Sequence, residues 1–486
     1  MDGTGIKVPV NRFILYALDT AFIAISLFLQ LFNADNIIWT IVGLVILNII
    51  FASNKEKNRM SYMLFTITFF TFLLSRLVVL RMEGEPLFDA YSDSTKIRVY
   101  AYLILGLTMI TVGQVIYERR HRGEFCAGIV PNSKDEHRWS KENNTLLFIV
   151  LVLYFITYPF SFLDLLDKAI FVGNYSYSAY YLEYTSRLPY VLTKLGSLNR
   201  IAFVLFLCVE HRKRKLVIPC VLYGITAIIS LGMGQRNVFV LDVLMFVVLI
   251  KHANDKSLEY TGESLYSKKL VAVTFAAIPL MIVFLGYWKY ARAGQKFESD
   301  DLFLYFKDFF YRQGEQIGFF ANTIEIESEI WAQKIPYTFS SIYNYLRNLF
   351  GLIDFGIYTR ENAFYGNSLA ATQFYITSPG SLENGSGSGC CYLSELYFDF
   401  GTLGIILGSI LIGYVLGALR LKEEKSCYVN TFVALMLRSI IYIPRASFSD
   451  WLATPFNIWN VAIVLCVMAT VNIINRKNRI RIWDHY

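Results

Sequence analysis

The stretch Thr145-Leu-Leu-Phe-Ile-Val-Leu-Val-Leu-Tyr-Phe-Ile-Thr-Tyr-Pro-Phe-Ser-Phe-Leu163 contains no charged residue. As a helix it is long enough to cross the ~30 Å hydrocarbon core of a bilayer. The whole 486-residue chain has this character, because 55% of it is hydrophobic and 17% is charged, against about 25% charged in soluble domains. The sequence therefore predicts an all-α membrane protein. It excludes a soluble enzyme, a nucleic-acid-binding domain and a secreted disulfide scaffold.

Apolar runs of similar length predict a polytopic helical bundle with about twelve transmembrane helices. The predicted spans are 13–32, 37–53, 60–80, 99–117, 145–163, 190–209, 216–232, 237–250, 270–288, 402–419, 426–443 and 455–474. The first span is predicted to be a retained anchor and not a removed signal, because it has full length and no small-residue cleavage site follows it.

Basic residues concentrate in alternate short loops of this predicted bundle. The loops that carry them are 55–59, 119–122, 212–215, 268–269, 420–422 and 476–479. Because Lys and Arg accumulate on the cytoplasmic side of a membrane, these loops and both chain termini are predicted to be cytoplasmic.

The predicted order divides the chain into three parts. Residues 1–288 carry helices one to nine, 289–400 form a large extracytoplasmic loop, and 401–486 carry the last three helices and a basic cytoplasmic tail. Within the large loop, residues 302–312 and 339–350 have apolar side chains on one helical face, which predicts amphipathic helices at the membrane interface. Residues 364–391 are rich in Gly, Ser, Asn and Tyr and are predicted to be a loop.

The residue types on the predicted outer side exclude several catalytic mechanisms there. The histidines all fall in predicted cytoplasmic loops or the tail, so histidine-based catalysis and zinc binding are excluded outside. The cysteines are scattered, apart from the adjacent Cys390 and Cys391, and are predicted to be free. No D-x-D triplet occurs on the outer side, although Asp164 and Asp167 share a helix face and are a weak alternative for a metal site.

Arginines at the outer ends of predicted helices suit a phosphate or diphosphate, because a guanidinium binds phosphate with two hydrogen bonds and keeps its charge when partly buried. The candidates for substrate binding are Arg236, Arg292, Arg438 and Arg445. Arg438 and Arg445 are seven residues apart and are expected to share one face of a helix. Each arginine alone is equally well explained as a snorkelling anchor.

Two acids near the same ends are candidates for catalysis. Glu395 precedes the predicted helix 402–419, and Asp450 follows Arg445 by five residues. The alternative for Glu395 is that it complements the helix dipole, and the alternative for Asp450 is an ion pair with Arg445. Another feature with two explanations is the group Tyr175–Tyr184, whose rings suit either an interfacial belt or stacking on sugars.

One long motif leads from a run of small residues through an acid into a predicted membrane helix: Gly387-Ser-Gly-Cys-Cys-Tyr-Leu-Ser-Glu395-Leu-Tyr-Phe-Asp-Phe-Gly401-Thr-Leu-Gly404-Ile-Ile-Leu-Gly408. This motif, the layout of the chain and the arginine turns at Arg236, Arg292 and Arg445 resemble the polysaccharide repeat-unit polymerases of bacterial envelopes, the Wzy family. The resemblance implies transfer of a growing glycan from undecaprenyl diphosphate to a new lipid-linked repeat unit at the outer leaflet of the bacterial plasma membrane. The product would be O-antigen, capsule or exopolysaccharide, with a chain-length regulator and a flippase as partners.

Two other functions fit parts of the sequence. A glycan or lipid exporter also has about twelve helices, but secondary transporters usually have related halves and ionisable residues near the midplane. O-antigen ligases are similar in design, but they are expected to use an outer histidine, and this chain has none on its predicted outer side.

If the chain is a polymerase, the candidate residues divide into two roles. Arg236, Arg292 and Arg445 are predicted to stabilise the departing diphosphate, and Glu395 is predicted to be the general base in preference to Asp450, which Arg445 would neutralise. We expect activity without a cofactor or a divalent metal. EDTA should therefore leave purified activity unchanged.

The topology is open to a direct test. A cysteine introduced at Ser386 should react with a membrane-impermeant maleimide in intact cells whose outer membrane is permeable, because 289–400 is predicted to be extracytoplasmic. A cysteine at the C-terminal Tyr486 should react only after the plasma membrane is opened. The reverse pattern would contradict the predicted orientation.

Overall fold

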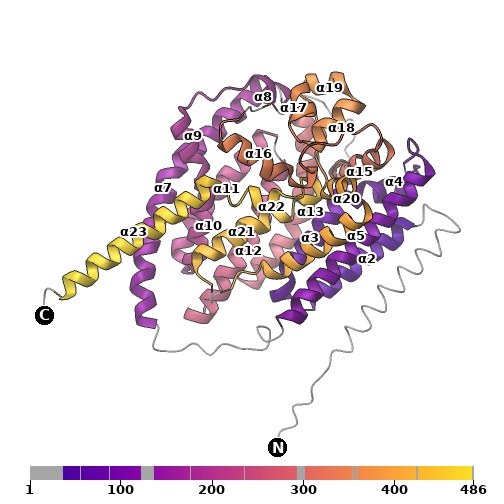
Figure 1. Ribbon diagram of the computed structural model, residues 1–486. Coiled ribbons are helices and arrows are strands. Elements are labelled where there is room, and N and C mark those ends of the chain that lie inside the picture. The colour runs from indigo at the N-terminus through magenta and orange to yellow at the C-terminus, as the bar shows by residue number, and fades with distance from the viewer. Residues whose placement is uncertain are drawn as a thin grey trace, which may run out of the picture.

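The computed structural model describes residues 37–54, 56–86, 88–121, 136–175, 177–234, 236–292, 302–352, 355–356, 359–422 and 425–483. Within these ranges every regular element is a helix and no strand occurs (Figure 1). The all-α fold class predicted from the sequence is therefore confirmed.

The membrane part consists of long apolar helices. They are α2 (Ile37–Ser53), α3 (Glu56–Phe69) continued by the π-helical turn η2 (Phe70–Leu74) and α4 (Ser75–Glu83), α5 (Asp93–Arg120), α7 (Glu136–Asn174), α9 (Tyr190–Ser197), α10 (Asn199–Val209), α11 (Lys213–Gly232), α12 (Arg236–Thr261), α13 (Lys268–Arg292), α20 (Tyr392–Ala418), α21 (Cys427–Ile440) and α23 (Ile458–Trp483). The short helix α8 (Tyr177–Glu183) precedes α9.

In the described residues, nine helical segments are long and apolar enough to cross a membrane, and α2 and residues 271–287 of α13 are shorter apolar helices. Each predicted span from 37–53 onward falls on one of these segments. The predicted span 13–32 lies outside the described residues. The polytopic bundle is thus confirmed.

Among the described helices, α5 and α20 share the most extensive contact and run side by side (Figure 1). A methyl group on Gly113 would lie 2.1 Å from the carbonyl oxygen of Ile410, and one on Gly413 would lie 2.0 Å from that of Ile110. The two glycines are reciprocal, since each faces the backbone beside the other. Small residues allow backbones to approach this closely, and such contact is what holds helices together in lipid.

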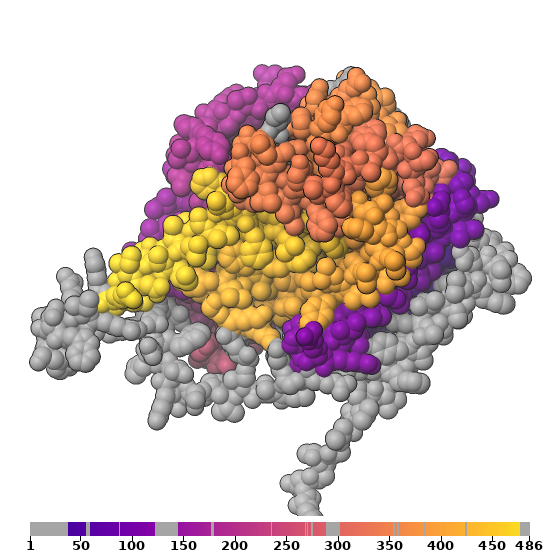
Figure 2. Space-filling model, in the orientation of Figure 1, coloured from indigo at the N-terminus to yellow at the C-terminus, as the bar shows by residue number. Residues whose placement is uncertain are grey.

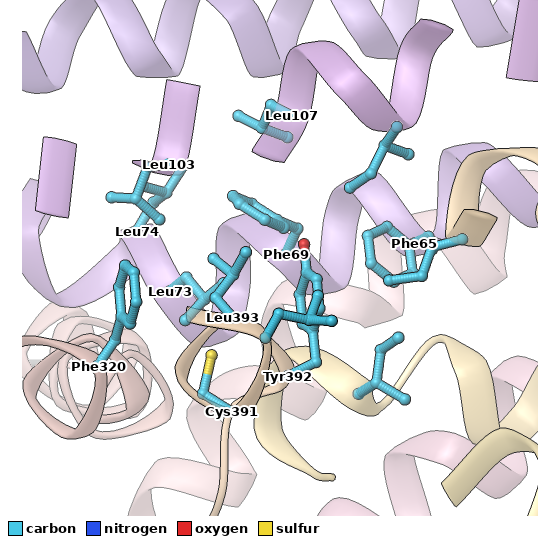
Figure 3. Close-up of a cluster of buried hydrophobic side chains, with 14 of the residues drawn as sticks. Phe65, Phe69, Leu73, Leu74, Leu103, Leu107, Phe320, Cys391, Tyr392 and Leu393 are labelled. Carbon is cyan, nitrogen blue, oxygen red and sulfur yellow. The ribbon is translucent and has the colours of Figure 1, made fainter. Parts of the chain in front are cut away.

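The first turn of α20 is fixed by a second set of contacts. Figure 3 shows Cys391, Tyr392 and Leu393 among Phe65, Phe69, Leu73, Leu74, Leu103, Leu107 and Phe320, and all of these residues belong to one buried cluster. The ring of Tyr392 meets that of Phe65 edge to face, with 6.2 Å between centroids. The start of α20 is therefore embedded between α3, α5 and the outer segment.

That outer segment forms a layer of short helices over one end of the bundle (Figure 2). Its elements are α14 (Leu302–Gln313), α15 (Gln316–Glu325), η3 (Tyr337–Phe339), α16 (Ser340–Leu349), α17 (Arg360–Tyr365), α18 (Leu369–Thr377) and α19 (Pro379–Glu383). The helices predicted at 302–312 and 339–350 are confirmed. The prediction of a loop over 364–391 is wrong, because α18 and α19 lie in it and Ser368 caps α18 by accepting from the Ala371 N–H.

The close contact of α5 and α20 predicts a large effect of a small substitution. Gly413→Ala should destabilise the protein by about 1–3 kcal/mol, because the methyl group meets a backbone oxygen that cannot move away independently. Gly224→Ala, in helix α11 with nothing within 4 Å of the added methyl group, is the matched control. Thermal unfolding in detergent measures both. Equal midpoints for the two variants would contradict this account of the packing.

Candidate functional site

A cavity of about 550 Å³ lies where the outer layer meets the bundle. Its walls come from α16, from the start of α20, from the segment 446–457 and from residues before α18. The lining residues are Ser340, Ser341, Asn344, Tyr345, Ser368, Leu369, Cys390, Glu395, Ala446, Ser447, Asp450, Ala453, Thr454 and Asn457. Both acids singled out from the sequence, Glu395 and Asp450, are among them.

The Glu395 carboxylate is held from two sides. Oε2 accepts hydrogen bonds from the Ser447 hydroxyl at 2.9 Å and the Phe448 N–H at 2.7 Å. Oε1 faces the Ser340 hydroxyl at 3.3 Å and the Cys390 thiol at 3.2 Å. With only 1% of its surface exposed, this carboxylate is oriented by its donors and not by water.

The hydroxyls around Glu395 cannot all donate to it at once. Ser340 Oγ and Ser447 Oγ lie 2.8 Å apart, and either can be the donor. Since a hydroxyl has one hydrogen, Ser340 donates either to Ser447 or to Glu395. The former arrangement leaves a lone pair of Oε1 open toward the cavity. Burial and the Glu395 carboxylate also raise the pKa of the Cys390 thiol, so this side chain is a neutral donor.

Asp450 begins the short helix α22 (Asp450–Ala453) and lines the same cavity. The expected ion pair with Arg445 does not form between these two described residues. Arg445 instead donates from Nη1 to the Gln313 carbonyl at 3.2 Å, and its guanidinium lies over the Phe72 ring. The argument that Arg445 neutralises Asp450 is therefore wrong, because the guanidinium is engaged elsewhere.

The position of α16 depends on Asp399. Its carboxylate accepts from the Tyr337 N–H at 3.1 Å and from the Thr338 N–H and hydroxyl, both at 2.6 Å. These groups lie in η3, which leads directly into α16. Two residues after Asp399, Gly401 has φ 61° and ψ −147°, where α20 bends. Such a conformation is open to glycine and strained for other residues.

Of the candidate arginines whose side chains the structure describes, Arg236, Arg438 and Arg445, none lines the cavity. Arg236 donates from Nη1 to the Leu285 carbonyl of α13 at 3.3 Å. Arg438 forms an ion pair of 2.7 Å with Asp242, which Arg200 also contacts at 3.1 Å. Arg292 is the last residue of α13, and its side chain lies outside the described part of the structure.

The expected common face of Arg438 and Arg445 is another prediction that the structure corrects. Helix α21 ends at Ile440, and Arg445 lies in the separate 3-10 turn η4 (Ile443–Arg445), which contains Pro444. The seven-residue spacing of Arg438 and Arg445 therefore does not place them on a common face, because the two residues are not on one helix. Arg438 contacts α12, and Arg445 contacts the outer layer.

The two acids near the end of α7, Asp164 and Asp167, are engaged in other contacts. Asp164 pairs with Lys168 at 2.7 Å, and Asp167 accepts from the Tyr184 hydroxyl at 2.9 Å and lies 3.5 Å from Arg187 Nε. Among the described residues, no group of three or more His, Cys, Asp or Glu has the arrangement of a metal site. The rings of Tyr180, Tyr181 and Tyr184 pack on one another.

Several cavity residues escaped the sequence analysis. Ser341, Asn344 and Tyr345 belong to the polar face of α16, which the periodicity showed without indicating what it covers. No motif or periodicity in the sequence marked Ser447, Thr454 or Asn457 as part of a site. A serine-rich turn directly after Arg445 was the one available clue.

The fold and this site define a polytopic membrane protein with a buried carboxylate in a polar cavity beneath a layer of short helices. A family model described as O-antigen polysaccharide polymerase Wzy matches residues 12–478. The chain belongs to this family and is an enzyme that polymerises lipid-linked repeat units. This assignment favours the polymerase over the exporter and the ligase. No curated protein and no solved structure shows significant similarity to the chain.

The contacts of Asp399 predict a local effect on the cavity wall. In Asp399→Ala the Tyr337 and Thr338 N–H groups lose their acceptor, which costs about 1–3 kcal/mol for buried groups. Hydrogen exchange of residues 337–345 should become about tenfold faster or more, because α16 opens more often. Asp399→Asn retains one acceptor oxygen and should show a smaller change. Unchanged exchange in Asp399→Ala would show that other contacts hold α16.

Proposed function

We propose that polymerisation takes place at the cavity, on the extracytoplasmic side of the bacterial plasma membrane, with Glu395 as the general base. The observation that carries the proposal is the Glu395 carboxylate in the cavity wall, oriented by Ser447 and the Phe448 N–H through one oxygen and facing Ser340 and Cys390 with the other. A base must be held within reach of the proton that it removes, and this arrangement supplies a fixed one.

In the proposed reaction the accepting hydroxyl of a new repeat unit enters the cavity beside Glu395 Oε1. The carboxylate takes the hydroxyl proton while the oxygen attacks the anomeric carbon of the growing glycan. The bond from that carbon to the lipid diphosphate breaks, and its electron pair stays with the departing diphosphate. The elongated glycan then remains on the lipid of the new unit, while free undecaprenyl diphosphate leaves.

The negative charge of the leaving group needs cations near the cavity but outside it. Arg445 suits this role, because the next residues, Ala446 and Ser447, line the cavity, and within the described part of the chain its guanidinium contacts the Gln313 carbonyl and the Phe72 ring and no acid. Arg236 and Arg292, at the ends of α12 and α13, remain proposed partners for the diphosphate. For Arg438, the ion pair with Asp242 favours a role in joining α12 to α21.

The proposal includes the orientation of the chain. The basic loops favour cytoplasmic termini, and with that orientation the cavity beneath the short helices of 302–383 would face the outer leaflet. There the enzyme would meet repeat units delivered by a flippase and act with a chain-length regulator. Undecaprenyl diphosphate is proposed as the lipid carrier.

Four substitutions test the assigned roles. Glu395→Gln and Arg445→Ala should each lower the polymerisation rate by about a hundredfold, and Arg236→Ala should do the same if it binds the diphosphate. Arg445→Lys should recover only part of the rate, because lysine lacks the planar fork. Glu361→Gln, which removes an exposed acid from the first turn of α17, is the control. Polymer length and initial rate are measured with purified protein and lipid-linked units.

The comparison with Asp450→Asn decides which acid is the base. Glu395→Gln should keep its about hundredfold lower rate over the whole pH range, whereas Asp450→Asn should retain turnover with altered acceptor affinity. Variants are compared only when their unfolding temperatures and monodispersity match those of the wild type. Full activity of Glu395→Gln together with loss in Asp450→Asn would transfer the base to Asp450.

A further inference from the structure

We propose that the cavity is selective for charge: it accepts an uncharged accepting sugar and rejects one that carries a carboxylate. This inference rests on the proposed function of the cavity as the acceptor site. It goes further, because it defines the chemical class of the sugar that receives the growing chain. The class comprises neutral hexoses, deoxyhexoses and N-acetylated hexosamines, as opposed to uronic and other acidic sugars.

The cavity wall contains two acids and no basic side chain. Glu395 and Asp450 are its carboxylates, and no Lys, Arg or His occurs among the lining residues, every one of which the structure describes. The other polar side chains of the wall are neutral: Ser340, Ser341, Asn344, Tyr345, Ser368, Cys390, Ser447, Thr454 and Asn457. Such groups suit the hydroxyls of a sugar and offer no counter-ion to an acid.

The nearest arginine along the chain does not alter this balance. The guanidinium of Arg445 donates to the Gln313 carbonyl and lies over the Phe72 ring, at 5.8 Å from its centroid. It forms no ion pair with Asp450, although both residues are described. The two cavity carboxylates are therefore not neutralised by it.

A buried acceptor without a hydrogen-bond partner in the cavity wall also favours a neutral sugar. Asn344 Oδ1 is buried and has no hydrogen-bond partner within the described structure. It lies in the cavity lining on α16. A buried oxygen of this kind requires a donor, which a sugar hydroxyl or an acetamido N–H provides. An ionised carboxylate provides acceptors only.

Burial without a counter-ion then separates two sugars of nearly equal shape. A hexose and its uronic acid differ by a hydroxymethyl group against a carboxylate at C6. The carboxylate would enter a partly buried site that holds two acids and no cation, so it would lose hydration and gain no counter-ion. Leaving a charge unpaired is a common device for rejecting a wrong partner.

The first experiment identifies the natural accepting sugar. The lipid-linked unit that accumulates in cells lacking this protein is compared by NMR with the finished polymer, and the sugar that gains a substituent between repeats is the acceptor. A neutral sugar supports the inference, and an acidic one overturns it.

The second experiment measures the selectivity of the cavity. A matched pair of synthetic glycosides, with –CH2OH or –COO⁻ at C6 of the accepting sugar and a short alkyl aglycone, can accept but cannot donate. Their binding to purified wild-type protein is measured without donor, and their extension is measured with lipid-linked donor. The neutral glycoside should bind and be extended at least about tenfold better than the acid.

Variants assign the cause of this selectivity. Asp450→Asn should reduce the neutral-to-acid binding ratio by about threefold or more, while the control Glu361→Gln should leave it unchanged. Equal binding of the two glycosides to the wild type, or an unchanged ratio in Asp450→Asn, would overturn the inference. Full activity of Glu395→Gln would instead contradict the proposed base, and the binding ratio would still report on the charge selectivity.

Discussion

The direct backbone contact between α5 and α20 is the constraint on which the site depends. Gly113 and Gly413 each face a carbonyl of the other helix, so that neither helix can rotate without separating from its partner. The start of α20 is held as well, because Cys391, Tyr392 and Leu393 are buried against α3, α5 and α15 (Figure 3). Glu395 follows one turn later. Its position is therefore set by helix packing in the bundle, while its hydrogen bonds set its orientation.

The layer of short helices completes the site, because it returns the chain to the start of α20. Asp399 binds η3 and thereby places α16, whose polar face then covers Glu395. The segment after α21 closes the other side through Ser447 and the Phe448 N–H. Three stretches that are distant in sequence thus meet at one carboxylate. The cavity exists only when all three are in place.

The sequence was sufficient to predict the helical bundle, because an apolar run that is long enough to cross a bilayer must form a helix there. It also singled out Glu395 and Asp450, which the structure brings together in the wall of one cavity, while their proposed roles stay predictions. It failed where tertiary contacts decide. The turn at Pro444 separates Arg438 from Arg445, and Arg445 prefers the Gln313 carbonyl to Asp450. Short helices such as α18, stabilised by capping and burial, also have little periodicity to detect.

The separation of charges around the cavity agrees with the chemistry of glycosyl transfer. A base that removes a hydroxyl proton works best without a neighbouring cation, because an ion pair would compete for its lone pairs. A departing diphosphate needs the opposite environment, with cations close to the developing charge. The structure turns the guanidinium of Arg445 away from Asp450, although only four residues intervene in the chain. One short segment thereby supplies an acid to the proposed acceptor side and an arginine to the proposed leaving-group side, and the two form no ion pair with each other.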